Sequence, residues 1–264
     1  MITKNEVDLY IQKIPPASSV LRETISLLNQ GELIKASHVA KEDLALCSYL
    51  KSLVNKPIYG FKNEVSDVSQ IFGILGVSAS KQTVYNYMMS LLSPKKWAMF
   101  KLNSALFSNL QATLSTNWIK ILKNLDIKDT EIASSISLLP ASIIVSDALF
   151  KDNMQNVELI RSSSDIDLNT ILKRLSGMDL FDICEQIAIK WDMSPSISKL
   201  VKVASGLRKT DDKNVEKLAK YMHLLLFHTL SQPQYIEANL NDFIDFQVDF
   251  VEDIYVDFMQ IMDI

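Results

Sequence analysis

Hydrophobic residues recur at helical spacing along almost the whole chain. Two early runs show this most clearly: Val20, Ile25, Leu27 and Leu28, and then Leu44, Leu46, Leu50, Leu53 and Val54. Residues that recur every three or four positions lie on one face of a helix, which can then be buried. Further helical segments are predicted at about residues 66–77, 79–93, 96–124, 129–149, 167–175, 179–192, 195–206 and 212–230. The pattern therefore predicts an all-α fold.

Helix-breaking residues divide these segments. They are Pro57 with Gly60, Gly76, Pro94, Asn124 with Asp126, Gly177, Pro195, Gly206 and Pro233. We expect one domain over residues 1–230, made of a helical subdomain to about residue 92 and a second over about 93–230. Residues 231–264 are predicted to form an acidic amphipathic C-terminal helix. Residues 151–167 are poor in apolar side chains and include three successive serines, so an exposed loop is predicted there.

Composition agrees with helices in a reducing compartment. The chain has 264 residues, 48% of them hydrophobic, and only 6 glycines and 7 prolines, which is few for a β-sandwich or barrel. Its two cysteines, Cys47 and Cys184, are too few and too far apart for a disulfide framework or a zinc cluster. The first residues carry charges throughout, and no later stretch has the roughly 18 apolar residues of a membrane span. We expect a cytoplasmic protein without membrane insertion.

Charge is distributed unevenly along the chain. No lysine or arginine follows Lys220, whereas residues 221–264 contain 8 acidic residues. The rest of the chain is only mildly basic and contains all 4 arginines, so it lacks the dense basic face that nucleic-acid binding requires. Nucleic acid is therefore not expected as a partner.

The acidic residues near the C-terminus fall three and four positions apart. Six of them are candidate partner-binding residues on one helical stripe: Asp242, Asp245, Asp249, Glu252, Asp253 and Asp257. A second stripe is apolar: Phe243, Phe246, Phe250, Ile254, Phe258 and Ile261. We expect the apolar stripe to pack on the same chain and the acids to face outward; a detachable partner-binding element is the alternative. Like charges at this spacing oppose a helix, so compensation is expected from Lys95, Lys96, Lys199, Lys202, Arg208 or Lys209, or from a second protein.

Several short motifs follow one another in an order that resembles the HDOD (HD-related output domain) family. Pro15 and Pro16 open a helix, Asp43 begins another, and the run from Asn55 through Tyr59 and Gly60 ends it. Gly76 closes the next helix, and Trp191 stands at a later helix end. The resemblance covers about residues 8–230. It implies a multi-helical, HD-domain-like fold and a bacterial signal-transduction module that regulates by protein–protein interaction, without a cofactor.

Asn55 and Gly60 also have a structural interpretation that does not need the family. Asn55 lies at a helix end shortly before Pro57, where its side chain can bind backbone groups left free by the end of the helix. Gly60 can take a positive φ as the chain turns. Both residues are therefore predicted to be structural rather than chemical.

The resemblance also indicates which metal ligands are missing. HD-type phosphohydrolases hold a divalent metal with a His, an adjacent His-Asp pair and a later Asp. In this chain the pair falls at Pro140 and Ala141, the first His near Asn109 to Gln111, and the late Asp near Leu226. Neither proline nor alanine has a ligating side chain. No metal ligand, cofactor-binding residue or catalytic residue is therefore expected.

The histidines do not restore such a site. They are His38, His223 and His228. The last two are five residues apart, about 140° around a helix, which is a poor arrangement for chelation. The expected partner is another signalling protein of unknown identity. Two alternatives remain open: a metal-dependent phosphohydrolase with unconventional ligands, and a sensor that binds a small ligand in the degenerate pocket near Pro140.

Overall fold

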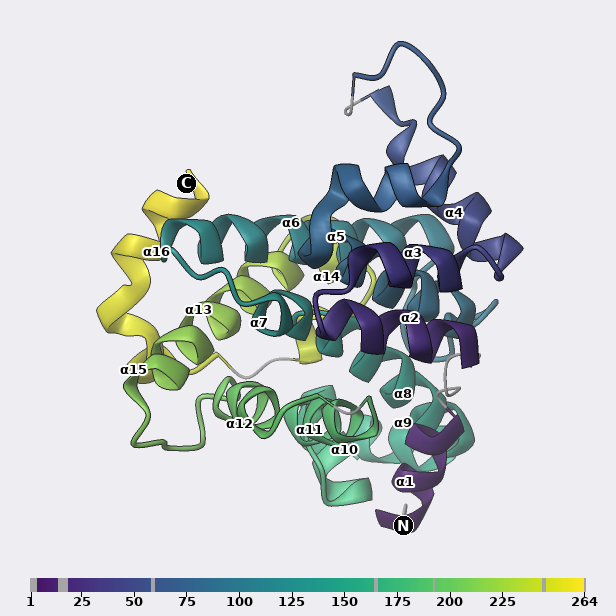
Figure 1. The fold of residues 1–264 in the computed structure, drawn as a ribbon. Coiled ribbons are helices and arrows are strands. Elements are labelled where there is room, and N and C mark those ends of the chain that lie inside the picture. Colours follow the sequence, from purple (N-terminus) through teal and green to yellow (C-terminus); the bar gives the residue numbers. More distant parts are fainter. Residues whose placement is uncertain are drawn as a thin grey trace. The chain divides into compact units, whose positions relative to one another are not determined.

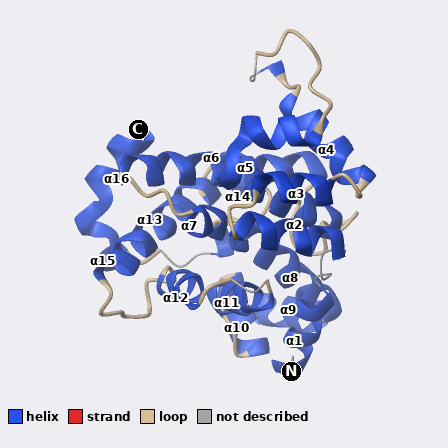
Figure 2. Cartoon of the chain, in the orientation of Figure 1, coloured by secondary structure: helices blue, strands red, loops and turns tan. Residues whose placement is uncertain are grey.

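The computed structural model describes residues 4–13, 19–57, 60–163, 166–191, 193–243 and 246–263. These residues form helices and contain no strand, which confirms the all-α prediction (Figure 2). The chain divides into two compact units. The small unit comprises Pro15–Leu92 and Asp129–Ser134, and the large unit comprises Met1–Ile14, Ser93–Lys128 and Ser135–Ile264.

The small unit is built from α2 (Ser19–Asn29), α3 (Leu33–Ala40), α4 (Leu44–Val54), α5 (Val68–Leu92) and most of α7 (Thr130–Ser135) (Figure 1). Helices α2, α3 and α4 all pack on α5. Leu28, Leu50 and Phe72 are fully buried in its core. α5 is broken at Gly76, which has φ 72°, a backbone conformation that favours glycine. The predicted boundary between two helices at this residue is therefore confirmed.

The large unit contains the remaining elements (Figure 1). They are α1 (Lys4–Lys13), α6 (Ser104–Asn124), α8 (Leu138–Asp152), α9 (Met154–Ser163), α10 (Leu168–Ser176), α11 (Leu180–Lys190), α12 (Pro195–Val203), α13 (Lys213–Leu230), α14 (Pro233–Glu237), η2 (Asn241–Phe243), α15 (Val248–Val251), η3 (Glu252–Ile254) and α16 (Tyr255–Met262). α11 packs between α8 and α12, and α13 packs on α12 and α6. Trp118 and Phe150 lie in the core.

The helix predicted over residues 96–124 begins only at Ser104, so its first part was predicted wrongly. The chain before α6 instead turns around the buried carboxylate of Asp147 on α8. This carboxylate accepts hydrogen bonds from the backbone N–H groups of Ala98, Met99 and Phe100, at 2.8 to 3.4 Å. A side chain distant in the sequence binds the N–H groups of this segment, and helical periodicity cannot reveal such a partner.

The loop predicted over residues 151–167 was also wrong, because α9 occupies Met154–Ser163. Among the side chains of this helix that the structure describes, only that of Val157 is buried, with 0% of its surface exposed. A helix with one buried side chain has almost no periodic pattern of apolar residues, so the sequence did not predict it.

The single C-terminal helix predicted for residues 231–264 is wrong as well. The described part of this region is divided among α14, η2, α15, η3 and α16. Acidic residues three and four positions apart, with no basic residue among them, destabilise one continuous helix. Short pieces can instead place their apolar side chains separately on α6 and α13, which both contact α16.

One helical stretch of the described chain, Thr130–Asp152, is long and apolar enough by composition to cross a membrane. In the structure 89% of its most apolar window is buried. The core helix of a globular protein has the same properties, so the stretch is weak evidence for a membrane span.

Candidate functional site

Pro140 and Ala141, the predicted degenerate metal positions, lie in the first turn of α8 and are buried. Beside them, the thiol of Cys184 on α11 donates a hydrogen bond to the carbonyl of Leu138 at 3.4 Å. Burial raises the pKa of Cys184 to about 12, so the thiol stays protonated at neutral pH. The side chains of Pro140 and Ala141 carry no atom that can ligate a metal, and Cys184 lies beside them as a buried thiol.

The other two predicted ligand positions hold uncharged residues. Leu226 on α13 is fully buried, and Gln111 on α6 is almost fully buried. Asn109 lies on the exposed side of α6, where its amide donates to the hydroxyl of Tyr235 at 3.2 Å. Across the described parts of the chain, no three His, Cys, Asp or Glu side chains are placed to hold a metal ion together.

Two residues of the predicted family motif, Asp43 and Asn55, lie at the two ends of α4 in the small unit. Asp43 caps α4 by accepting from the N–H groups of Ala45 and Leu46. Asn55 ends this helix: its amide donates to the carbonyls of Lys51 and Val65, and its carbonyl accepts from the N–H of Val65. The side chain thereby binds backbone groups on both sides of the turn, which is a structural role.

Among the other motif residues, the structure describes Gly60 and Trp191 but not Pro15, Pro16 or Tyr59. Gly60 has φ 66°, a conformation that favours glycine. Trp191 is the C-cap of α11 in the large unit, and its backbone N–H donates to Ile187.

The C-terminal residues 246–263, which we name the strap, lie along α6 and α13 of the large unit (Figure 1). The buried His223 on α13 connects the strap to the preceding chain. Its Nε2 accepts a hydrogen bond from the backbone N–H of Gln247 at 3.1 Å, and its Nδ1 lies 2.8 Å from the carbonyl of Ala204. These contacts require Nδ1 to carry the proton and Nε2 to be the acceptor.

Aromatic rings reinforce this connection. Phe246 stacks on Phe227 at a centroid distance of 4.1 Å and on His223 at 5.7 Å. Farther along the strap, Phe258 is 1% exposed and its ring contacts His228 at 6.0 Å. The expectation that the aromatic stripe packs on its own chain is therefore confirmed for these residues.

Gly206 lets the strap approach the backbone closely. It has φ 74°, and an added Cβ would lie 2.7 Å from Cβ and Cγ of Gln247 and 3.2 Å from the ring of Phe250. Both the backbone conformation and the short distances exclude a larger side chain here without movement of the strap.

Ion pairs join the strap to two lysines. Lys220 on α13 lies 2.8 Å from Asp253 and 3.4 Å from Glu216. Although burial opposes it, these carboxylates raise the pKa of Lys220. Lys120 on α6 pairs with Asp263.

These lysines correct the prediction of the compensating basic surface. Among the expected residues, Arg208 pairs with Asp182, and Lys202 pairs with Glu185. Arg208 and the expected Lys209 also line a cavity together with Asp249 of the strap. Sequence reasoning missed Lys120, Lys220 and His223. A signal existed for two of them, since Lys220, His223 and Phe227 are spaced three and four apart and so share one face of α13.

The candidate partner-binding acids whose side chains are described are all exposed, as expected, but they lie on three short elements, α15, η3 and α16, and not on one helix. Asp253 turns to Lys220 while 58% of its side chain remains exposed, and Asp249 and Asp257 each line a cavity. Glu252 is exposed. The Asp245 residue and the Asp242 side chain lie outside what the structure describes.

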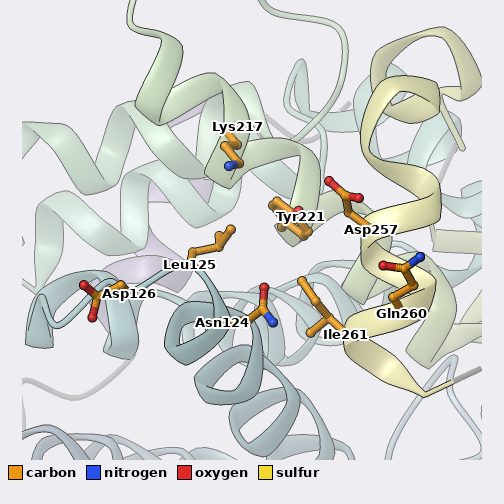
Figure 3. A pocket seen from close by; sticks show the side chains of 8 residues that line it. All are labelled: Asn124, Leu125, Asp126, Lys217, Tyr221, Asp257, Gln260 and Ile261. Carbon is orange, nitrogen blue, oxygen red and sulfur yellow. The ribbon is translucent and has the colours of Figure 1, made fainter.

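The second of these cavities lies where the strap meets the ends of α6 and α13, as Figure 3 shows. It has a volume of about 560 Å³ and is lined by Asn124, Leu125, Asp126, Lys217, Tyr221, Asp257, Gln260 and Ile261. Burial, followed by the charges of Asp257 and Asp253, raises the pKa of Tyr221, so its hydroxyl stays neutral. The walls combine an ammonium group, a phenol, carboxylates and amides.

Comparisons with known proteins agree with this fold. The HDOD domain family model matches residues 14–206. The chain is similar to the crystal structure of an HDOD domain protein of unknown function from Geobacter sulfurreducens, with 13% identity and a TM-score of 0.64 over 98% of this chain and 95% of that one. It is also similar to a proposed phosphohydrolase from Shewanella amazonensis SB2B, with 14% identity and a TM-score of 0.63 over 97% of each chain. No curated protein matches. At these identities the likeness to the two structures shows the fold alone.

Proposed function

Because the chain belongs to the HDOD domain family, we propose that it is a bacterial regulatory protein that transmits a signal by binding another protein and catalyses no reaction. One observation carries the proposal: Pro140 and Ala141 stand buried at the positions where the resemblance to HD-type enzymes implies the His-Asp pair. Neither residue has a side-chain atom that can bind a metal or move a proton.

The surroundings of these residues support the same interpretation. A metal site needs several ligands and polar groups that orient them. Here the neighbouring positions are the buried Leu226 and the uncharged Gln111, and the nearby thiol of Cys184 is protonated. The protein described as a phosphohydrolase is the one from Shewanella amazonensis. At 14% identity, a shared fold does not show that the two proteins share an activity.

The proposed partner is another signalling protein in the cytoplasm. The two cysteines are both free thiols, as is usual in a reducing compartment. The described surface also carries isolated large apolar side chains, such as Leu44, Leu159 and Val256, each more than half exposed.

The enzymatic part of the proposal is tested by metal and activity measurements. Purified chain is dialysed and examined by elemental analysis, then assayed against a phosphomonoester and a cyclic dinucleotide with added Mn²⁺ or Mg²⁺. We expect less than one metal ion per chain and no turnover. An HD-type phosphohydrolase with an intact His-Asp pair is the positive control. A stoichiometric metal that survives dialysis, together with turnover, would contradict the proposal.

The binding part is tested with the chain as bait in extracts of its native bacterium, followed by mass spectrometry and by reconstitution with each purified candidate. The proposal requires a saturable complex with at least one purified signalling protein. A bait unfolded by heat controls for adhesion to exposed apolar surface.

A further inference from the structure

The strap is attached to a small set of residues in the large unit, which we name the strap surface. It comprises Lys120 of α6, Gly206 of the α12–α13 loop, and Lys220, His223, Phe227 and His228 of α13. Each hydrogen bond, ion pair and ring contact described above between the strap and the rest of the large unit uses a side chain of this set.

The strap cannot hold its own conformation. Its helical pieces are α15 with 4 residues, η3 with 3 and α16 with 8. Isolated helices of this length are unstable in water, so the order of the strap comes from docking. Its ion pairs lie at the exterior, where 58% of the Asp253 and 81% of the Asp263 side chain is exposed, and such pairs contribute little. Packing of apolar side chains, including the buried Val251, Ile254 and Phe258, therefore provides most of the attachment.

The strap surface has the chemistry to receive an acidic chain that carries aromatic residues. Lys120 and Lys220 provide positive charge for carboxylates. Phe227 and the imidazole of His223 provide stacking faces, and Nε2 of His223 accepts a backbone N–H from whatever chain lies there. Gly206 leaves room for a chain against the backbone. None of these groups recognises a feature that belongs to the strap alone.

We infer that the strap surface is a docking site for an acidic, phenylalanine-bearing segment of the partner protein, and that the strap occupies the site until such a segment displaces it. The inference rests on the proposed function for the existence of a partner, and on the contacts of the strap for the chemistry of that partner. Opposite charge attracts such a segment, while the aromatic side chains determine how firmly it stays.

The inference is tested with a fluorescent synthetic peptide of residues 241–264 as the model segment. The opened protein is the full chain with Phe250→Ala and Phe258→Ala, which weakens the strap and leaves the strap surface intact. We expect the opened protein to bind the peptide at least about tenfold more tightly than the wild type, whose site is occupied. A scrambled peptide of the same composition is the control for charge alone.

A third variant of the chain tests where the peptide binds. Adding Lys220→Glu to the opened protein should weaken binding of the peptide by about tenfold and reduce its dependence on salt. Lys199→Glu, outside the strap surface, is the matched control and should leave the affinity unchanged. If the opened protein is folded by circular dichroism but does not bind the peptide, or binds the scrambled peptide equally, the inference is overturned.

Hydrogen exchange on the wild type provides a second test that needs no substitution. Excess peptide should displace the strap and reduce the protection of backbone amides 247–251, while the amides of α8 stay unchanged. Unchanged protection at saturating peptide would overturn the inference. No cellular partner enters these experiments, so failure to bind the peptide refutes the strap surface as a docking site, whereas failure to find any partner refutes the proposed function.

Discussion

The first turn of α8 and the strap surface differ in what their residues can do, although both lie in the large unit. At Pro140 and Ala141 the side chains are buried, apolar and inert. At the strap surface, Lys220 and His223 use charge and hydrogen bonds to hold a segment more than 20 residues away in sequence. Pro140 and Ala141, where we place the counterpart of the HD-type His-Asp pair, therefore pack in the core, whereas the side chains that hold a second segment of the chain lie on α13.

The largest expected effect comes from restoring the missing pair. Pro140→His with Ala141→Asp places two polar side chains in a buried apolar turn, where neither has a partner. We expect the free energy of unfolding to fall by about 5 kcal/mol. Chemical denaturation measures the loss, and Ala148→Asp, at a half-buried position of the same helix, should cost clearly less. If the double variant instead bound a stoichiometric metal and kept its stability, the α8 position would still be a metal site.

Asp147 tests whether the rest of α8 is equally structural. Asp147→Ala removes the acceptor of three backbone N–H groups, those of Ala98, Met99 and Phe100. We expect a loss of about 3 to 5 kcal/mol, measured by urea denaturation. Asp152→Ala, at the exposed end of the same helix, is the matched control and should change stability by less than about 0.5 kcal/mol. Equal effects of the two substitutions would show that the N–H groups have other partners.

Phe258 tests the attachment of the strap. Phe258→Ala removes a side chain that is 1% exposed in contact with α13, and we expect a loss of about 3 kcal/mol. Hydrogen exchange should show that the amides of the strap lose protection first, while those of α8 keep theirs. The exposed Val256→Ala is the control. A uniform loss of protection in α8 and the strap would mean that the two regions unfold together.

The smallest expected effect concerns pH at the strap surface. Burial lowers the pKa of His228 below 6.5, its ordinary value, because the charged ring is poorly solvated there. The unfolded chain therefore takes up a proton near pH 6.5 more readily than the folded chain does. The stability contributed by neutral His228 is present above about pH 6.5 and is lost as pH falls below it. Melting temperatures of the wild type and of His228→Gln, compared between about pH 7.5 and 5.5, should show a larger fall in the wild type.

Residues with local partners were predicted well from the sequence. Asn55 ends α4, and its amide binds the carbonyl of Lys51, four residues earlier. Gly60 and Gly76 have positive φ at predicted breaks. A hydrogen bond over four residues or a glycine turn depends on the immediate chain, so composition and spacing reveal it. The aromatic stripe of the strap was found for the same reason, because burial of large rings is nearly obligatory.

The all-α fold, the main helix breaks and the burial of the C-terminal aromatics were determined by the sequence itself, because each follows from residue type and from neighbours within a few positions. The tertiary structure alone decided that Asp147 holds residues 98–100, that the C-terminal region breaks into short pieces, and that Asp253 meets Lys220, 33 residues earlier. These features join residues far apart in the chain. Their partners are selected by the packing of the whole large unit, and no local pattern of charge or hydrophobicity specifies which lysine a given carboxylate will reach.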